Sequence, residues 1–265
     1  MNVMELFSLK GRVAFVVGGA RDLGLDMATA LGEVGADLII SSRDEKKSRE
    51  SALKLAAGLK VRTLGLGLDA TDEQQVQKAF AIVKKEFGRL DVLVNNVGGG
   101  AGRGNPQIEE RAKADWDWTL KLNLDAMFLC TRSAIPIMKR QKSGSIINIA
   151  SISGMLGRDR SVYAGLPGMH SSPDYQTAKA GVINFTRDLA AYLGAYGVRC
   201  NAISPGGFKR NNKEKFVKAY SRHTMLGRMG EDGTDLKGAV VLLASHAGAY
   251  ITGHNLAVDG GFTAW

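Results

Sequence analysis

The sequence lacks the features of a membrane-spanning or secreted protein. Nowhere does it contain a run of about 18 apolar residues, the length that a helix needs to cross a bilayer. The first nine residues include Glu5 and lack the basic start and apolar stretch of a secretion signal. We therefore expect a soluble, cytoplasmic protein that contacts no membrane.

Cysteine and histidine are scarce, and neither is spaced to bind a metal. Cys130 and Cys200 lie in apolar segments that indicate a helix and a strand, and no Cys-x-x-Cys motif is present. None of the four histidines forms a metal-binding spacing with another ligand. We expect a reduced protein with no metal in its site.

Internal repeats, low-complexity tracts and linkers are also absent. A chain of 265 residues, 45% of them hydrophobic, is long enough to bury one substantial core. We therefore predict a single domain over residues 1–265.

The formal net charge of +9 comes from lysines and arginines that are spread along the chain among acidic residues. There is no basic tail or nucleic-acid recognition motif, so we expect no nucleic-acid partner. Two interpretations of the charge remain. The basic surface is merely solvated, or its field attracts anionic small molecules such as a cofactor phosphate or an acidic substrate.

Short apolar runs alternate with helical patterns, which predicts an α/β fold. The first unit is a strand at 12–17, a helix at 23–34 and a strand at 36–40. The alternation continues with strands near 61–66, 90–94, 145–150, 198–203 and 255–258, and helices near 44–57, 71–87, 118–138, 175–193 and 236–245. Such crossovers require a doubly wound parallel sheet with helices on both faces.

Two segments, 154–174 and 206–229, interrupt this alternation of strands and helices. Both follow the carboxyl ends of predicted strands, where ligands bind in open α/β sheets. We expect them to form the walls of a substrate pocket.

The first strand leads into a helix through a glycine-rich turn, Gly18-Gly19-Ala20-Arg21-Asp22-Leu23-Gly24. Glycines at this place let the backbone approach a diphosphate, whose charge is stabilised by free amides at the helix N-terminus. On its own, such a turn is also ordinary loop chemistry.

A phenol and an ammonium, Tyr175 and Lys179, stand four residues apart and so share one face of a helix. The alternative Tyr163 has Pro167 at the corresponding position. Ser151 closes the strand at 145–150, where its side chain points into the cleft, and we favour it over Ser153.

Together these motifs resemble the short-chain dehydrogenase/reductase family. Asn95-Asn96-Val97-Gly98 is similar to the family's Asn-Asn-Ala-Gly signature, and family-like features extend to Val258-Asp259-Gly260-Gly261, so the resemblance covers nearly the whole chain. It implies a Rossmann-type fold and an NAD(P)-dependent oxidoreductase that interconverts an alcohol and a carbonyl.

The resemblance also implies which residues bind the cofactor: Gly18, Arg21, Asp22, Leu23, Gly24, Ser42, Arg43, Asp69, Ala70, Asn96, Gly98, Tyr175, Lys179, Pro205 and Gly206. Ser42 stands where an acid would accept a hydrogen bond from the ribose of NAD, whereas Arg21 and Arg43 suit the 2′-phosphate of NADP. We therefore favour NADP. NAD stays possible if Arg43 is only a surface charge at the start of a helix.

Two positions depart from the family pattern. Asp22 replaces an expected glycine, and its carboxylate either repels a phosphate or accepts a ribose hydroxyl. Arg210 stands where a threonine often contacts the nicotinamide portion, so that contact is in doubt.

By resemblance, Ser151, Tyr175, Lys179 and Asn123 form the catalytic set. Tyr175 is the proton donor and acceptor, and Lys179 lowers its pKa and holds the nicotinamide ribose. Ser151 donates to the substrate oxygen, and Asn123 positions a water that connects Lys179 to solvent.

The separation of Ser151 and Tyr175 indicates an insert, 158–173, which we expect to cover the active site. Cationic and hydrogen-bonding groups in both pocket segments favour an anionic or hydroxyl-rich substrate, namely a sugar, sugar acid or polyol. A 3-oxoacyl-(acyl-carrier-protein) reductase and a non-catalytic cofactor-binding regulator are the alternatives. The resemblance further implies a homotetramer built on the helices that contain Asn123 and Tyr175.

Overall fold

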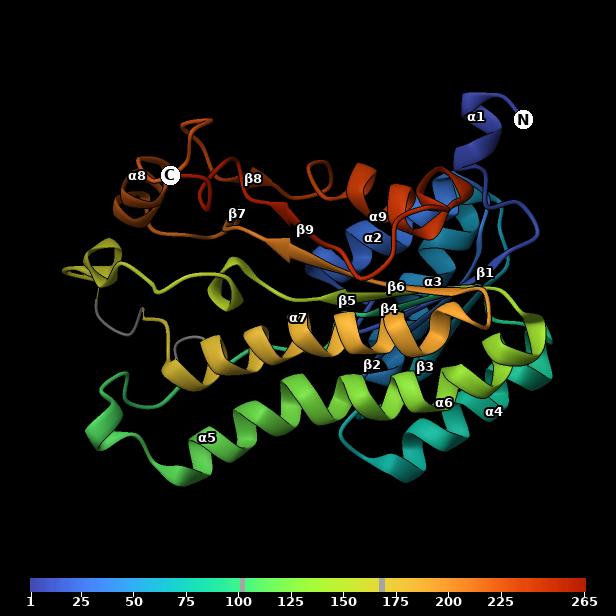
Figure 1. Ribbon diagram of the computed structural model, residues 1–265, viewed down its shortest axis with the longest axis horizontal. Helices are drawn as coiled ribbons and strands as arrows, with labels where there is room; N and C mark the ends of the chain where they lie inside the picture. The colour runs from blue at the N-terminus through green and yellow to red at the C-terminus, as the bar shows by residue number, and fades with distance from the viewer. Residues whose placement is uncertain (101–102, 167–169) are drawn as a thin grey trace.

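Every pair of neighbouring strands in the central sheet is parallel. The computed structural model describes residues 1–100, 103–166 and 170–265. In spatial order the strands are β3 (Thr63–Gly67), β2 (Asp37–Ser42), β1 (Val13–Val17), β4 (Val92–Asn95), β5 (Gly144–Ile149), β6 (Val198–Pro205) and β9 (Asn255–Val258) (Figure 1). The predicted doubly wound, Rossmann-type sheet is confirmed.

The central strands are apolar along their whole length because helices cover both faces of the sheet. In β1, Phe15 and Val17 pack into the core on one side, and Ala14 and Val16 into the core on the other. Successive side chains of a strand point to opposite faces, so a strand buried on both sides reads as a continuous apolar run.

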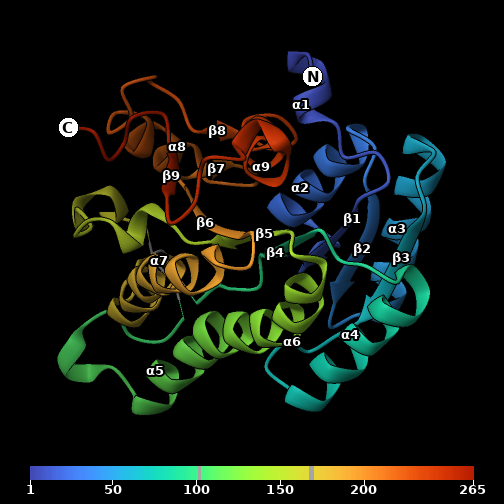
Figure 2. The ribbon, with the colours of Figure 1, turned by 45° about the vertical axis from the view of Figure 1, so that its right-hand side comes forward.

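The helices form one layer on each face (Figures 1 and 2). The layer over Ala14 and Val16 contains α2 (Asp22–Glu33), α3 (Glu45–Leu59) and α9 (Lys237–Ala244). The opposite layer contains α4 (Glu73–Phe87), α6 (Ala126–Gln141) and α7 (Pro173–Gly194). The smaller elements are α1 (Val3–Phe7), α5 (Lys113–Leu120), α8 (Glu214–Ser221) and the strand pair β7 (Phe208–Lys209) and β8 (Gly230–Glu231).

The helix predicted at 118–138 is helical throughout, but its hydrogen bonding changes midway. A π-helical turn, Lys121–Asp125, joins α5 to α6 and contains Asn123. Such turns insert one extra residue into an α-helix and are frequent at functional sites.

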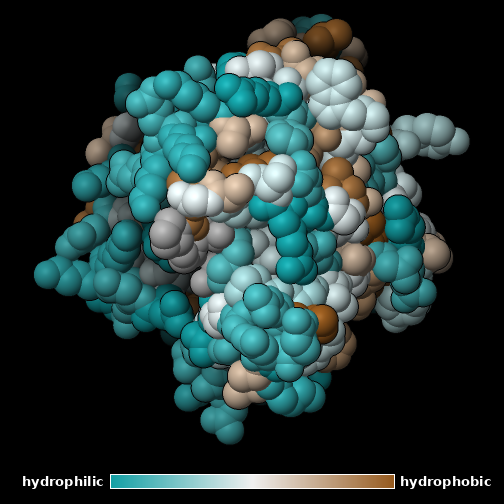
Figure 3. All heavy atoms as spheres, turned by 90° about the vertical axis from the view of Figure 1, so that its left-hand side faces the viewer, coloured by the Kyte–Doolittle hydropathy of each residue, from teal (hydrophilic) through white to brown (hydrophobic). Residues whose placement is uncertain are grey.

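The two segments predicted to line a pocket meet beyond the carboxyl ends of the strands. Tyr163 of the first stacks on Phe216 of α8, and Tyr220 stacks on Phe262 near the C-terminus. Figure 3 views this end of the molecule, where hydrophilic side chains cover most of the surface. Part of the insert, residues 167–169, lies outside the described residues.

Both cysteines are buried free thiols, and burial raises the pKa of each to about 12. Among the described residues, none of the helices has the length and apolar character needed to cross a bilayer.

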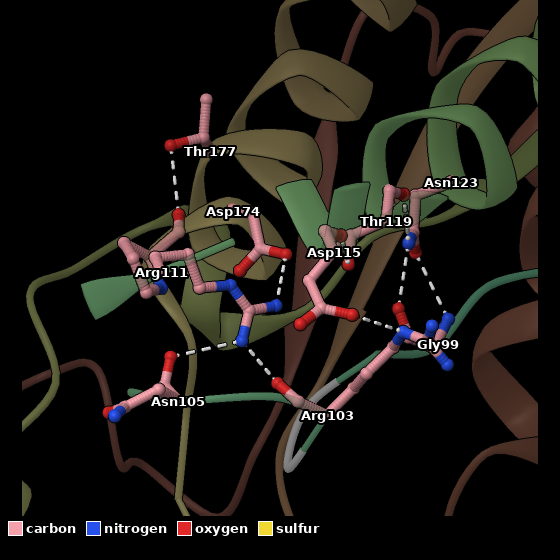
Figure 4. Close-up of polar contacts among 10 residues, drawn as sticks. Gly99, Arg103, Asn105, Arg111, Asp115, Thr119, Asn123, Asp174 and Thr177 are labelled. Atoms are coloured by element: carbon pink, nitrogen blue, oxygen red, sulfur yellow. Dashed lines mark hydrogen bonds and ion pairs between the residues drawn. The ribbon is translucent and has the colours of Figure 1, made fainter. Parts of the chain in front are cut away.

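A buried ion pair ties the loop before α5 to the first turn of α7 (Figure 4). An Arg111 nitrogen lies 2.5 Å from Asp174 Oδ2, and the two side chains are 2% and 0% exposed. Arg111 also donates to the carbonyls of Arg103 and Asn105. The pair therefore fixes the turn of α7 that carries Tyr175.

Replacing Asp174 with Asn leaves the Arg111 guanidinium buried without a counter-charge, so we expect the free energy of unfolding to fall by about 3 kcal/mol. Burial by itself raises the pKa of Asp174, but hydrogen bonds and the Arg111 charge outweigh burial and hold that pKa below its ordinary value. The carboxylate thus stabilises the fold above its unfolded-state pKa, and this contribution is lost as pH falls through the folded-state pKa. Urea unfolding at neutral and acidic pH measures both effects.

The matched control is Lys113→Gln, which breaks an exposed ion pair with Asp117 in the neighbouring helix α5. Exposed pairs contribute little. If Asp174→Asn unfolds no more readily than Lys113→Gln, or is as acid-sensitive as the wild type, the stabilising role of the buried pair is wrong.

Candidate active site

The glycine turn between β1 and α2 is held by close backbone approach. Gly18 adopts φ +79° and Asp22 φ +51°, both in the left-handed region. A Cβ on Gly24 would lie 2.1 Å from the Gly18 carbonyl oxygen, so only glycine fits there. That same oxygen accepts a 2.8 Å hydrogen bond from Asn96 Nδ2, which connects the turn to the end of β4.

A pocket of about 270 Å³ lies over this turn, at the point where the strand order reverses between β1 and β4. It is lined by ten of the predicted residues: Gly18, Arg21, Asp22, Leu23, Ser42, Arg43, Asp69, Ala70, Asn96 and Gly98. Its other lining residues are Leu68, Val97, Leu122 and Arg210. Leu68, Val97 and Leu122 were missed because an apolar residue beside a strand end carries no signal that separates pocket from core.

Five other predicted cofactor-binding residues do not line this pocket: Tyr175 and Lys179, which are described below, and Gly24, Pro205 and Gly206. Gly24 packs beneath the turn, while Pro205 ends β6 and the Gly206 amide donates to the Val258 carbonyl at 2.9 Å. Gly206 is also crowded, because a Cβ there would lie 2.9 Å from the Asp259 backbone.

The pocket suits an anionic ligand that carries a diphosphate. Its lining includes the guanidinium groups of Arg21, Arg43 and Arg210, and it opens onto the N-terminus of α2. The residue before that helix, Arg21, makes no side-chain cap, so backbone amides of the first turn stay available.

Gly98 connects this pocket to the predicted catalytic residues. A Cβ on Gly98 would lie 2.7 Å from Asn123 Oδ1 and 2.9 Å from Lys179 Nζ. The chain therefore brings Asn123, from the π-helical turn, and Lys179, from α7, together at the end of β4.

Lys179 is a buried ammonium whose side chain is 4% exposed. Its Nζ donates a 2.7 Å hydrogen bond to the Ile149 carbonyl at the end of β5. Burial lowers the pKa of Lys179 to about 8, because the charged form loses its hydration. Nζ lies 5.8 Å from the centre of the Tyr175 ring, one helical turn away.

The pKa of Tyr175 is raised by burial, and a hydrogen bond with Ser151 and the positive charge of Arg158 oppose that rise. The effect of Lys179 on this pKa stays a prediction. Desolvation of the phenol dominates, and the cation that opposes it is Arg158, which lies in the insert. Ser151 Oγ in turn accepts a 3.1 Å hydrogen bond from the Ser153 amide.

Asn123 has partners for both ends of its amide (Figure 4). Its Nδ2 donates to the carbonyls of Gly99 at 2.7 Å and Thr119 at 2.8 Å, and its Oδ1 accepts from the Gly99 amide at 3.1 Å. This buried helical asparagine thus fastens the loop after β4 to the π-helical turn.

Arg158, from the insert, contacts Ser153 and acts electrostatically on Tyr175. It donates to Ser153 Oγ at 3.3 Å and to the Tyr163 hydroxyl at 2.5 Å, and its guanidinium lies 5.5 to 5.9 Å from the ring centres of Tyr163, Tyr220 and Phe262. No carboxylate pairs with it in the described part of the chain. The residues that the structure describes also contain no group of three or more metal-binding side chains.

Comparison with known proteins agrees with this geometry. A family model described as enoyl-(acyl carrier protein) reductase matches residues 18–263. The uncharacterized oxidoreductase YgcW of Escherichia coli is 37% identical, over 98% of this chain and 95% of its own length. A probable NADP-dependent mannitol dehydrogenase of Yarrowia lipolytica is 34% identical, over 98% and 91% of the two chains.

Two further proteins are also similar to this chain. A 3-oxoacyl-(acyl-carrier-protein) reductase of Thermotoga maritima is 32% identical, over 96% of this chain and 98% of its own. The solved structure of a gluconate 5-dehydrogenase from Burkholderia cenocepacia, in complex with NADP and tartrate, matches with a TM-score of 0.88 at 29% identity and covers 100% of both chains. The chain belongs to the short-chain dehydrogenase/reductase family, and it is an NAD(P)-dependent oxidoreductase.

Proposed function

We propose that this oxidoreductase interconverts a secondary alcohol and a ketone on a sugar, sugar acid or polyol, with NADP as its cofactor. The observation that carries the substrate class is Arg158. Within the described residues it has no ionic partner, it donates to Ser153 Oγ, and its charge acts on the Tyr175 phenol. A guanidinium in this position suits a carboxylate or several hydroxyl groups.

The pocket between β1 and β4 fits the cofactor. Gly18 and Gly24 have no side chains, so the tightly packed turn leaves room for a diphosphate at the N-terminus of α2. Gly98 lies between the pocket and Lys179. We assign the diphosphate to the turn at Gly18 and Leu23, the adenine to Asp69 and Ala70, and the nicotinamide end to Asn96, Gly98, Pro205 and Gly206. The bound nicotinamide supplies or takes up a hydride.

The choice of NADP is supported by the residues at the end of β2. Ser42 holds no charge and bonds to Ser48 Oγ and the Asp44 carbonyl, each at 2.8 Å. Arg43 and Arg21 line the same pocket and suit a 2′-phosphate.

The catalytic residues handle the proton. With its pKa raised, Tyr175 keeps its proton near neutral pH and donates it to a ketone oxygen, as reduction requires. Ser151 donates a hydrogen bond to that oxygen. Lys179 holds the nicotinamide ribose and supports Tyr175, and Asn123 positions the water through which Lys179 is reprotonated.

A second candidate is a 3-oxoacyl-(acyl-carrier-protein) reductase. It is favoured by the Thermotoga relative and by the net charge of +9, which suits an acidic carrier protein. A non-catalytic regulator is disfavoured because all four catalytic side chains are present and two of them, Asn123 and Lys179, adjoin Gly98 in the pocket lining.

We also propose a homotetramer built on the layer of α6 and α7. Phe128 on α6 and Tyr192 on α7 are exposed, as is Tyr196 just beyond α7. Exposed aromatic side chains on neighbouring helices are typical of subunit interfaces.

Replacing Tyr175 with Phe removes only the hydroxyl, so we expect kcat to fall at least about 10²-fold because proton transfer is lost. NADPH binding, measured by nucleotide fluorescence, stays nearly unchanged. Tyr250→Phe is the control, since it removes the hydroxyl of a fully exposed tyrosine. A Tyr175→Phe enzyme with wild-type turnover would disprove the assignment.

Replacing Arg43 with Gln removes a charge-assisted contact to the 2′-phosphate, so we expect NADPH to bind about tenfold more weakly while NADH is unaffected. Fluorescence titration measures both affinities. Lys46→Gln removes a neighbouring exposed charge of α3 that does not line the pocket. Equal losses for NADPH and NADH, or no loss, would mean that Arg43 does not select NADP.

Replacing Arg158 with Gln lowers kcat/KM for a keto-sugar acid by about tenfold or more, because the carboxylate loses its partner. A neutral keto-sugar of the same length is affected much less, and Arg160→Gln in the same insert is the control. Steady-state assays that include an acetoacetyl thioester decide between the candidates. A strong preference for the thioester would contradict the sugar proposal and favour the carrier-protein reductase.

A further inference from the structure

The two departures from the family pattern, Asp22 and Arg210, face each other across the mouth of the cofactor pocket. Asp22 Oδ1 lies 3.8 Å from a terminal nitrogen of Arg210, and Oδ2 lies 3.6 Å from Arg21 Nε. All three residues line the pocket. A carboxylate that replaces a glycine is thus placed between two guanidinium groups.

The local backbone conformation does not explain why an aspartate stands at position 22. At φ +51° an L-residue costs roughly 1 kcal/mol relative to glycine, although Asp and Asn tolerate the left-handed region better than other residues. As the first residue of α2, Asp22 gains from the helix dipole, yet within the described residues no amide donates to its carboxylate. Its ionic partners are Arg21 and Arg210.

Arg210 is braced from the other side. Its Nε lies 2.5 Å from Asp232 Oδ2, and the next residue along, Gly233, donates its amide to Asp26 Oδ2 on α2 at 2.8 Å. This bracing holds Arg210 over the first turn of α2, where a diphosphate would lie.

The contacts of Asp22 are looser than this bracing. Charge-assisted hydrogen bonds measure about 2.7 to 2.9 Å, whereas the two Asp22 distances are 3.6 and 3.8 Å. Asp22 is also 46% exposed and Arg210 36% exposed. A more highly charged anion can therefore displace the Asp22 carboxylate from Arg210.

We infer that Asp22 is an internal counter-anion of the cofactor site. It neutralises Arg21 and Arg210 when the site lacks cofactor, and the diphosphate of the cofactor takes its place on Arg210. Asp22 therefore weakens cofactor binding and Arg210 strengthens it. The diphosphate is common to NADP and NAD, so the inference does not depend on which of them the enzyme prefers.

The test is a double-mutant cycle of Asp22→Asn and Arg210→Gln, read out as the Kd of NADPH and of NADH by fluorescence titration. Asn removes the charge and keeps the tolerance for the left-handed backbone, so we expect both cofactors to bind about tenfold more tightly. Arg210→Gln weakens both. In the Arg210→Gln background, Asp22→Asn gains much less, because Arg210 is gone and only Arg21 is left to release.

Salt and a control variant separate this effect from a structural one. The gain from Asp22→Asn shrinks at high ionic strength, because the groups are exposed and screened. Glu33→Gln removes one negative charge from the far end of the same helix, where Glu33 pairs with Lys237, and leaves both Kd values unchanged. Asp22→Gly provides a second uncharged variant with no backbone strain, and it binds as Asp22→Asn does.

Two results would overturn the inference. Unchanged or weaker binding in Asp22→Asn would mean that the carboxylate does not oppose the cofactor, as when it accepts a ribose hydroxyl. An equal gain with and without Arg210 would mean that Asp22 repels the cofactor directly and exchanges with nothing.

Discussion

The geometry of the site depends on hydrogen bonds from side-chain amides and one ammonium to backbone groups at the ends of the central strands. Asn96 donates to the Gly18 carbonyl, Asn123 pairs with both backbone groups of Gly99, and Lys179 donates to the Ile149 carbonyl. A buried polar group without a partner costs about 1 to 3 kcal/mol, so these bonds leave few other arrangements of the strand ends. The glycine turn, the π-helical turn and α7 are thereby placed against one another.

The same burial sets the protonation state of the catalytic pair. It raises the pKa of Tyr175 and lowers that of Lys179 to about 8, so near neutral pH the phenol is protonated and Lys179 is still mostly an ammonium. The protonated phenol is the form that donates to a ketone, whereas oxidation of an alcohol requires a phenolate. Under the catalytic role proposed for Tyr175, this protonation state suits reduction. The opposite direction needs additional positive charge near the phenol, of which Arg158 already provides part.

The strands and helices were predictable because each is specified by local pattern. The continuous apolar run of β1 and the periodic apolar face of α4 are visible in the sequence, and the pairing of Tyr175 with Lys179 follows from helical spacing. Features that depend on distant residues were not predictable. Arg111 and Asp174 are 63 residues apart, and many other charges were equally available as partners. The raised pKa of Tyr175 depends on how deeply the folded chain buries the phenol.

Two other features escaped prediction for a different reason. The π-helical turn changes the hydrogen bonding within a segment that is helical on both sides, and none of its residue types, Lys121–Asp125, marks the change. Helix α8 is short and lies in a strongly charged segment. Its two buried residues, Phe216 and Tyr220, stand four apart, and this spacing is the one sign in the sequence that the helix has a buried face.

The departures from the family pattern occur where the physical cost of change is small. Asn123 and Lys179 are buried, and replacing either one leaves buried backbone groups without their hydrogen-bond partners. Asp22 and Arg210 lie at the rim of the pocket, where solvent screens each charge and where one change can be balanced by the other. The catalytic groups are therefore fixed by hydrogen bonds that cannot be altered one at a time. The affinity for the cofactor, in contrast, is adjustable through a pair of exposed charges that leaves the reaction chemistry untouched.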